Sequence, residues 1–291
     1  MSFDLALFHL VNSFCGNWAL DHIARYEENN YFFKGGIFLT AYWWFWFSGE
    51  GERRRDNRRV IIAAIVGALV ALTLNRVMSA VLPFRVRPMY VPDIGYHVPS
   101  VGTPMNMENW SSFPSDSATF WFALAFGLFR LYRPLGIVCM IYSTVWMCLS
   151  RLYLGMHYPS DLIAGAALGT SVVWMTEKAF AASGRTWIGA YTQQFLYWLH
   201  RLELTRPKVF YAVAFLVSFE LTVMFDDLRN GVRGVLHALK AVGFLYATES
   251  AALFVLLGGG VVVIATTAGL AAGARRRMRR PHTEKQLSRS L

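Results

Sequence analysis

The feature that most constrains this chain is a series of apolar stretches, several of which reach the roughly 20 residues that a helix needs to cross a bilayer. Only 16% of the 291 residues are charged, against roughly 25% in a typical soluble domain. A single soluble domain, a disordered chain and a disulfide-rich secreted module are therefore excluded. We expect an all-α fold, a polytopic membrane helical bundle of about seven spans. The expected spans are residues 31–48, 60–82, 115–132, 134–152, 159–178, 209–225 and 248–272.

Two other segments mix apolar and charged residues at helical spacing, which is typical of helices that lie on a membrane surface. Residues 4–30 are expected to form one such amphipathic helix, and residues 179–208 to contain another. The N-terminus has no basic segment followed by an apolar core, so we expect no cleavable signal peptide.

Positive charge is concentrated beside the apolar stretches. Arginine clusters occupy residues 53–59 and 275–280, and the net charge is +10. Because Lys and Arg are enriched in cytoplasmic loops, this placement predicts topology and not nucleic-acid binding. With residues 49–59 inside, the inner loops and the tail hold 19 of the 28 Lys and Arg residues. Residues 83–114 and the turn between the fourth and fifth spans then face outward.

Three segments of this outer side carry side chains suited to phosphate chemistry. Arg87 and Arg151 offer forked donors to phosphate oxygens. Ser115 stands at a predicted helix start, where anions bind well. His157 and Asp161 are four residues apart at the start of another helix and share one face. A carboxylate bonded to one imidazole nitrogen leaves the other nitrogen free and more basic, as a nucleophile toward phosphorus requires.

The last of these segments carries a family resemblance. The pattern Ser-Arg-x₅-His-x₃-Asp, formed by Ser150, Arg151, His157 and Asp161, resembles the third signature of the type 2 phosphatidic acid phosphatase superfamily without a mismatch. This resemblance implies hydrolysis of a lipid phosphate or diphosphate without a metal, through a phosphohistidine intermediate. It also implies that His157 is the nucleophile and that Asp161 is its orienting partner.

Two shorter segments extend the resemblance, which covers about residues 1–178. Phe-Pro-Ser-Asp at 113–116 is similar to the second signature, in the variant found in undecaprenyl diphosphate phosphatases. Arg87 and the proline after it are similar to the end of the first signature, Lys-x₆-Arg-Pro. By this likeness Arg87, Ser115 and Arg151 would hold the phosphate.

Two positions depart from the family pattern. The first-signature lysine should stand seven residues before Arg87, where this chain has Ala80. Arg76 lies on the same helical face, roughly 24 Å along the expected span, and either reaches the phosphate or extends toward lipid headgroups. Arg85 is the alternative replacement. The histidine that the family uses to protonate the leaving group is Ser117 here.

Asp116 and Ser117 complete the expected phosphate-binding segment. We expect the Asp116 carboxylate to be a helix-start charge that faces away from the phosphate, since a carboxylate in the site would repel the substrate. His97, in the outer loop, is expected to be solvated and not to be a replacement acid.

The sequence predicts three regions: a lipid phosphatase-like membrane core at 1–178, an interfacial or cytoplasmic connector at 179–208, and a two-span extension with a basic tail at 209–291. The expected location is a bacterial inner membrane, with the site facing the periplasm. The expected partners are a lipid phosphate substrate and membrane lipids, with no nucleic acid, and the sequence predicts no oligomeric state.

The expected function is hydrolysis of a polyprenyl (undecaprenyl) diphosphate, or a related lipid phosphate, on the outer face. Two alternatives stay open: a phosphotransferase that passes the phosphate to a lipid or glycan acceptor, and a catalytically weak relative that binds or moves a phospholipid. No cofactor and no metal are expected, and the scattered cysteines, at positions 15, 139 and 148, predict neither a disulfide framework nor a metal site.

Overall fold

The computed structural model describes residues 3–101, 107–182 and 187–223. Every regular element in these ranges is helical, which confirms the all-α expectation for this part of the chain. The expected seventh span at 248–272 and the basic tail lie outside the described residues. The chain divides into two compact units, one formed by residues up to Gly189 together with Leu221–Val223, and the other including Ala190–Glu220.

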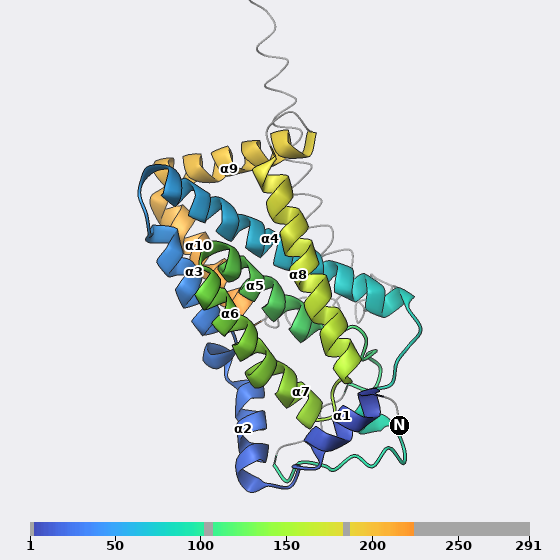
Figure 1. Ribbon diagram of the computed structural model, residues 1–291. Helices are drawn as coiled ribbons and strands as arrows, with labels where there is room; N and C mark the ends of the chain where they lie inside the picture. Colours follow the sequence, from blue (N-terminus) through green and yellow to red (C-terminus); the bar gives the residue numbers. More distant parts are fainter. Residues whose placement is uncertain (1–2, 102–106, 183–186, 224–291) are drawn as a thin grey trace, which may run out of the picture. The chain divides into compact units, whose positions relative to one another are not determined.

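Three long helices form the core of the larger unit. Helices α4 (Gly51–Val81), α5 (Asp116–Leu131) and α8 (Pro159–Ala181) pack against one another (Figure 1). Helix α5 is buried along most of its length, and Trp121 and Leu124 are among its fully buried side chains. The position of α5 is therefore set by apolar contacts on several sides, which makes its first turn a firm support for a site.

Two glycines let α8 approach α5 closely. A Cβ atom on Gly165 would collide with the carbonyl oxygen of Ser115, and one on Gly169 would collide with that of Thr119. Because glycine has no Cβ, the two backbones meet directly. The contact brings the start of α8 to the start of α5, where the Ser115 N–H donates a 3.1 Å hydrogen bond to the Asp161 carbonyl oxygen.

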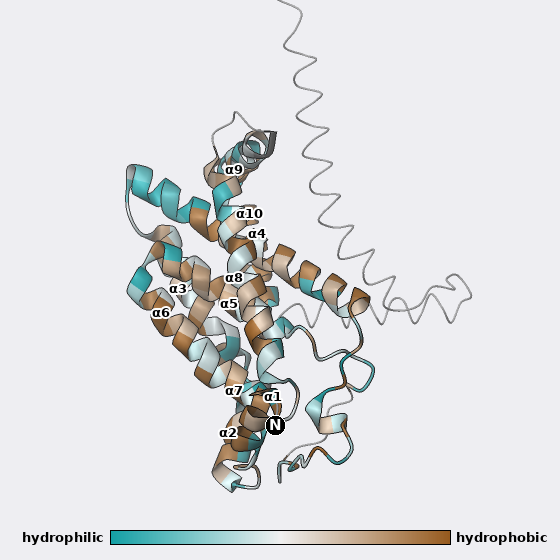
Figure 2. Ribbon diagram, turned by 45° about the vertical axis from the view of Figure 1, so that its right-hand side comes forward, coloured by the Kyte–Doolittle hydropathy of each residue, from teal (hydrophilic) through white to brown (hydrophobic). Residues whose placement is uncertain are grey.

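Helix α4 begins at Gly51, nine residues before the span expected from the sequence. Most of the expected basic loop at 49–59 is therefore helical, and Figure 2 shows these hydrophilic first turns ahead of the apolar remainder of α4. A helix of 31 residues is about 46 Å long, which exceeds the roughly 30 Å of a hydrocarbon core. The arginines can continue the helix because they lie beyond the length that a bilayer would enclose.

Two helical segments of the described chain are long and apolar enough to cross a membrane. One is α4, and the other is Arg133–Tyr153. The second is continuous through α6 (Arg133–Tyr142), the π-helical η3 (Ser143–Cys148) and α7 (Leu149–Tyr153). The remaining expected spans stay predictions.

The N-terminal segment forms two helices, α1 (Phe3–Asn12) and α2 (Trp18–Asn29), so the expectation of one amphipathic helix over 4–30 is wrong. The break has a local cause. Gly16 adopts a φ of +94°, and the Asn17 side chain accepts hydrogen bonds from the first N–H groups of α2. Both helices pack against α7, and α1 also contacts α8.

The remaining elements are short or belong largely to the smaller unit. The π-helical turn η1 (Phe32–Gly36) leads into α3 (Ile37–Phe47), and the 3₁₀ turn η2 (Pro88–Tyr90) follows α4. Helices α9 (Trp187–Thr205) and α10 (Pro207–Thr222) follow α8.

Candidate active site

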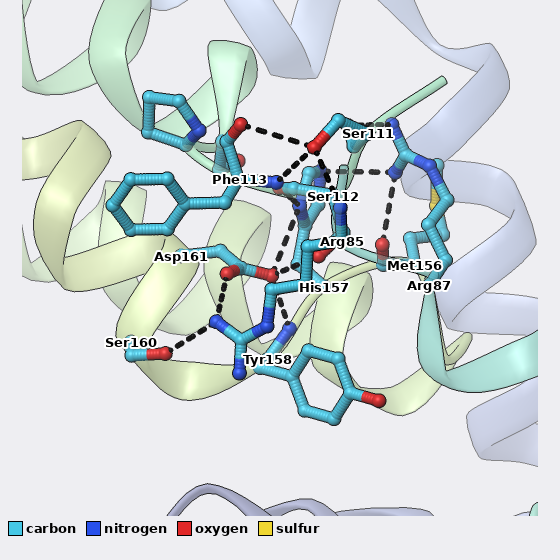
Figure 3. Close-up of polar contacts among 12 residues, drawn as sticks. Arg85, Arg87, Ser111, Ser112, Phe113, Met156, His157, Tyr158, Ser160 and Asp161 are labelled. Carbon is cyan, nitrogen blue, oxygen red and sulfur yellow. Dashed lines mark hydrogen bonds and ion pairs between the residues drawn. The ribbon is translucent and has the colours of Figure 1, made fainter. Parts of the chain in front are cut away.

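The three polar segments of the sequence meet at one end of the core helices (Figure 3). They are the chain after α4, the chain before α5, and the turn between α7 and α8. Backbone hydrogen bonds connect them: the Ser112 N–H donates to the Arg85 carbonyl at 2.9 Å, and the Met89 N–H donates to the Gly155 carbonyl at 2.9 Å. The tertiary structure therefore brings together side chains that lie far apart in the sequence.

His157 lies in the turn before α8 and is almost fully buried. Its Nδ1 atom is 2.8 Å from the carbonyl oxygen of Ser112, and its Nε2 atom is 3.3 Å from Nη1 of Arg87. A carbonyl can only accept and a guanidinium can only donate, so the neutral ring carries its proton on Nδ1. Burial lowers the pKa of His157, and the nearby Asp161 only partly offsets this effect. At neutral pH, Nε2 is therefore unprotonated, and its lone pair faces the Arg87 guanidinium.

Asp161 does not make the short hydrogen bond to His157 that the sequence suggests. Its Oδ2 atom lies 3.8 Å from His157 Nδ1, which is an ion-pair contact beyond hydrogen-bond distance. The same oxygen accepts hydrogen bonds from the Ser112 hydroxyl at 2.5 Å and from the Tyr158 N–H at 2.8 Å. Its other oxygen accepts from Arg85 at 2.5 Å. The carboxylate is therefore fully engaged by groups other than the imidazole.

Arg85 is bound between two carboxylates. Besides Asp161, it donates to Asp4 of α1 at 2.7 Å and to the Ser160 hydroxyl at 2.8 Å, and its guanidinium lies 4.1 Å from the centre of the Tyr158 ring. Arg85 is therefore the counter-ion of both Asp161 and Asp4, and these two carboxylates neutralise the charge that it could offer to a phosphate.

Arg87 is held beside the nucleophile candidate by main-chain oxygens. It donates to the carbonyls of Trp110 at 3.2 Å, Met156 at 2.9 Å and Ser111 at 3.4 Å. Burial lowers the pKa of Arg87, but an arginine stays protonated in proteins. A fixed positive charge next to His157 Nε2 is well placed to attract and orient an anion.

Arg76 and Asp116 form an ion pair at the start of α5. Their closest atoms are 2.5 Å apart, and the Arg76 guanidinium lies 4.9 Å from the centre of the Trp110 ring. Arg76 therefore neutralises the Asp116 carboxylate at the start of α5. The expectation that Asp116 faces away from the phosphate stays a prediction.

Ser115 and Ser117 are both buried at the start of α5. The Ser115 side chain accepts from the Ala118 N–H at 3.4 Å and caps the helix, as expected from the sequence. The Ser117 N–H donates a 2.8 Å hydrogen bond to Asp116 Oδ1, so this carboxylate is bonded within the first turn of α5.

Arg151 is buried next to α2. Its Nη1 atom lies 3.6 Å from Oε2 of Glu27 and 3.7 Å from the sulfur of Met156. The same Glu27 oxygen accepts a 2.6 Å hydrogen bond from the Ser150 hydroxyl, while Glu27 Oε1 has no hydrogen-bond partner in the described part of the chain. Arg151 and Arg87 therefore both contact Met156. The charge of Arg151 is balanced by Glu27 of α2.

His97 takes no part in this cluster. Its side chain is exposed, and its backbone N–H and carbonyl are both bound by the Asn12 side chain, at 2.7 and 3.1 Å. Within the described residues, no group of three or more His, Cys, Asp or Glu side chains is arranged to hold a metal ion.

Comparison with known proteins agrees with this geometry. Residues 61–185 match the PAP2 superfamily, the family of the type 2 phosphatidic acid phosphatases. The chain contains a PAP2 domain. No solved structure gives a significant match.

Several curated proteins share the PAP2 region. A lipid A 1-phosphatase of Rhizobium johnstonii is 35% identical over 100 residues, which are 34% of this chain and 40% of the relative. The bacitracin transport permease protein BcrC of Bacillus licheniformis is 32% identical over 85 residues, 28% of this chain and 41% of the relative. A decaprenylphosphoryl-5-phosphoribose phosphatase of Mycobacterium tuberculosis is 36% identical over 74 residues, 25% of this chain and 40% of the relative. The chain thus spans about two fifths of the length of these relatives.

All three signature segments lie inside the matched residues 61–185, but two carboxylates that contact these segments do not. Asp4 and Glu27 come from α1 and α2, outside the matched residues. Neither residue is predicted from the sequence, because both look like ordinary polar residues of amphipathic helices. No local spacing links Glu27 to Ser150, which is 123 residues away.

Proposed function

We propose that this protein is a membrane lipid phosphatase that hydrolyses a polyprenyl diphosphate, such as undecaprenyl diphosphate, through a phosphohistidine intermediate. The observation that carries the proposal is the unprotonated Nε2 atom of buried His157, 3.3 Å from the Arg87 guanidinium. The names of two relatives, a lipid A 1-phosphatase and a decaprenylphosphoryl-5-phosphoribose phosphatase, support a lipid phosphate as the substrate class.

The proposed reaction has two steps. A phosphate oxygen takes over the hydrogen bond that Arg87 now donates to His157. The Nε2 lone pair then attacks phosphorus, the bond between phosphorus and the leaving oxygen breaks, and that oxygen leaves with the electron pair. Water next attacks the phosphohistidine, the P–N bond breaks, and inorganic phosphate and neutral imidazole are released.

Three arginines and one serine hydroxyl would stabilise the charges in this reaction. Arg87 and Arg151 bind phosphate oxygens. We assign the place of the missing lysine to Arg76, which pairs with Asp116, because Arg85 is held between two carboxylates, Asp4 and Asp161. Ser115 adds a hydroxyl at the N-terminus of α5, where the helix dipole favours an anion. The Nδ1 proton stays on the ring, directed at the Ser112 carbonyl.

The absence of the leaving-group histidine favours a diphosphate over a monoester. A monoester expels an alkoxide, whose parent alcohol has a pKa near that of water, about 15.7. A diphosphate expels a phosphate monoester instead, whose second pKa is about 6, and which can depart unprotonated. With Ser117 in place of the histidine, we propose that diphosphates are cleaved much faster than monoesters.

We also propose how the chain is placed in the membrane. Residues 1–178 form the catalytic core, 179–208 the connector and 209–291 a two-span extension, in a bundle of about seven spans. The bias of Lys and Arg toward 49–59 and the tail supports a site that faces the periplasm of a bacterial inner membrane.

A phosphate-release panel with purified protein tests this function. We expect rapid release from undecaprenyl diphosphate, slow release from undecaprenyl monophosphate and phosphatidic acid, and none in His157→Ala. Turnover that persists in His157→Ala would refute the phosphohistidine route. Labelled phosphate that appears on an added lipid or glycan, and not in solution, would favour the phosphotransferase alternative.

A further inference from the structure

Ser112 is the point where all three polar segments meet, although it belongs to none of the signature positions. It is completely buried. Its N–H donates to the Arg85 carbonyl at 2.9 Å, and its hydroxyl donates to Asp161 Oδ2 at 2.5 Å. Its carbonyl accepts from His157 Nδ1 at 2.8 Å. Ser112, in the segment before α5, is thus bonded to Arg85 of the segment after α4 and to His157 and Asp161 of the segment between α7 and α8 (Figure 3).

These three bonds leave the Ser112 carbonyl little freedom. The residue is anchored on one side by its N–H and on the other by its hydroxyl, so the direction of the carbonyl between them is set by Arg85 and Asp161. A carbonyl that points at Nδ1 selects the tautomer in which Nε2 is unprotonated. The direction of this carbonyl, together with the Arg87 donor at Nε2, therefore favours the tautomer in which His157 can act as a nucleophile.

Asp161 is placed to act on the carbonyl and not on the ring. Its Oδ2 atom is 2.5 Å from the Ser112 hydroxyl but 3.8 Å from His157 Nδ1. Its remaining contacts, with the Tyr158 N–H and with Arg85, hold the carboxylate in this position. A hydrogen bond weakens steeply beyond its normal length, so the strong path from Asp161 to His157 runs through Ser112.

We propose that Ser112 is a positioning residue through which Asp161 orients His157 and keeps the proton on Nδ1. The inference rests on the proposed function, since it assigns Ser112 a part in the same reaction. Ser112 does not touch the substrate. Before the phosphate arrives, it holds the imidazole in the reactive tautomer. While phosphorus is attached to Nε2, the Ser112 carbonyl continues to accept the hydrogen bond from Nδ1–H.

Kinetics of four variants test the proposal. Ser112→Ala and Ser112→Cys remove the strong hydroxyl donor, and Cys keeps the size of the side chain. For both we expect kcat on undecaprenyl diphosphate to fall about 10- to 100-fold with KM little changed, as for supporting partners of reactive histidines elsewhere. Ser112→Thr keeps the hydroxyl and should restore most of kcat. Ser143→Ala, which removes another fully buried hydroxyl that bonds only a helical carbonyl, is the matched control and should keep wild-type kcat.

A double-mutant cycle separates positioning from simple packing. If Asp161 acts through Ser112, Asp161→Asn should cost much less in the Ser112→Ala background than in the wild type. Independent effects that multiply to within about twofold would overturn the proposal. Wild-type kcat in both Ser112→Ala and Ser112→Cys would overturn it as well.

A spectroscopic readout keeps the test independent of turnover. In protein labelled with ¹⁵N-histidine, the His157 resonances, assigned by their loss in His157→Gln, report which ring nitrogen carries the proton. We expect the Nδ1–H form in the wild type and a loss of this preference in Ser112→Cys. An unchanged tautomer in Ser112→Cys would refute the positioning role even if the protein released no phosphate, whereas a wild type without phosphate release would refute only the proposed function.

Discussion

Nε2 of His157 lies 3.3 Å from Nη1 of Arg87, and both side chains are buried. Burial lowers the pKa of His157, and the charge of Arg87 lowers it further because a cation disfavours a protonated imidazole beside it. The same cation is a favourable neighbour for a phosphate. The pair therefore keeps the proposed nucleophile neutral when the site is free of substrate and presents a positive charge to an incoming anion.

The first prediction concerns Arg87. Arg87→Lys keeps the charge but cannot bond three carbonyls and a phosphate at the same time, because lysine lacks the forked guanidinium. We expect kcat/KM on undecaprenyl diphosphate to fall about 10²- to 10³-fold, as for the loss of one fixed donor to a developing charge. Arg130→Lys, which alters an arginine paired with Glu177 away from this cluster, is the control and should leave kcat/KM nearly unchanged. Equal losses in the two variants would contradict the role of Arg87.

The second prediction concerns pH. The reaction needs unprotonated Nε2, and burial lowers the pKa of His157 below its ordinary value of about 6.5. Activity should therefore persist below pH 6.5 and be lost only as the pH falls through the lowered pKa. Because Asp161 acts to raise this pKa, the acid limb of kcat/KM should move to still lower pH in Asp161→Asn. An acid limb at or above the ordinary histidine value would show that another group controls the reaction.

The third prediction concerns Glu27. Glu27→Gln keeps the side-chain shape but removes the charge that balances buried Arg151. We expect kcat/KM to fall about 10- to 100-fold, because an orienting partner of a phosphate ligand is lost. Glu177→Gln removes a carboxylate that also pairs with an arginine, Arg130, and serves as the matched control. If the two variants behave alike in phosphate release, Glu27 has only a general structural role.

The fourth prediction concerns the leaving group. Ser117→His restores the proton donor of the family pattern, and a general acid typically contributes about 10²- to 10⁴-fold. Hydrolysis of undecaprenyl monophosphate and phosphatidic acid should rise more than hydrolysis of undecaprenyl diphosphate. The measurement is the ratio of phosphate-release rates for the two classes in the variant and the wild type. Equal wild-type rates on both classes would show that some other group already protonates the leaving oxygen.

The fifth prediction concerns topology. Single cysteines at the exposed positions Glu52 and Val98, in a background without the three native cysteines, should react with an impermeant thiol reagent from opposite sides of the membrane. Val98 should be labelled in intact cells and Glu52 only after permeabilisation. Labelling of both from one side would overturn the proposed orientation.

Local patterns in the sequence were enough to predict the helical class and the main members of the site. His157 and Asp161 are four residues apart and Arg151 lies six residues before His157, so a short stretch of chain carries most of the third signature. Helix breaks were harder to predict. The break at Gly16 depends on a single positive φ and a cap at Asn17, whose effect a general amphipathic pattern does not show.

The sequence by itself determined that this is a helical, membrane-type chain with a PAP2 signature, because apolar length and short-range spacing are properties of neighbouring residues. Only the tertiary structure decided which carboxylates each arginine pairs with. Arg76 and Arg85 are chemically identical, yet one faces Asp116 and the other is enclosed by Asp4 and Asp161. These partners lie 40 to 81 positions away, and packing brings them together. The burial of Ser112 against Asp161 and His157 depends in the same way on the meeting of segments that no local pattern connects.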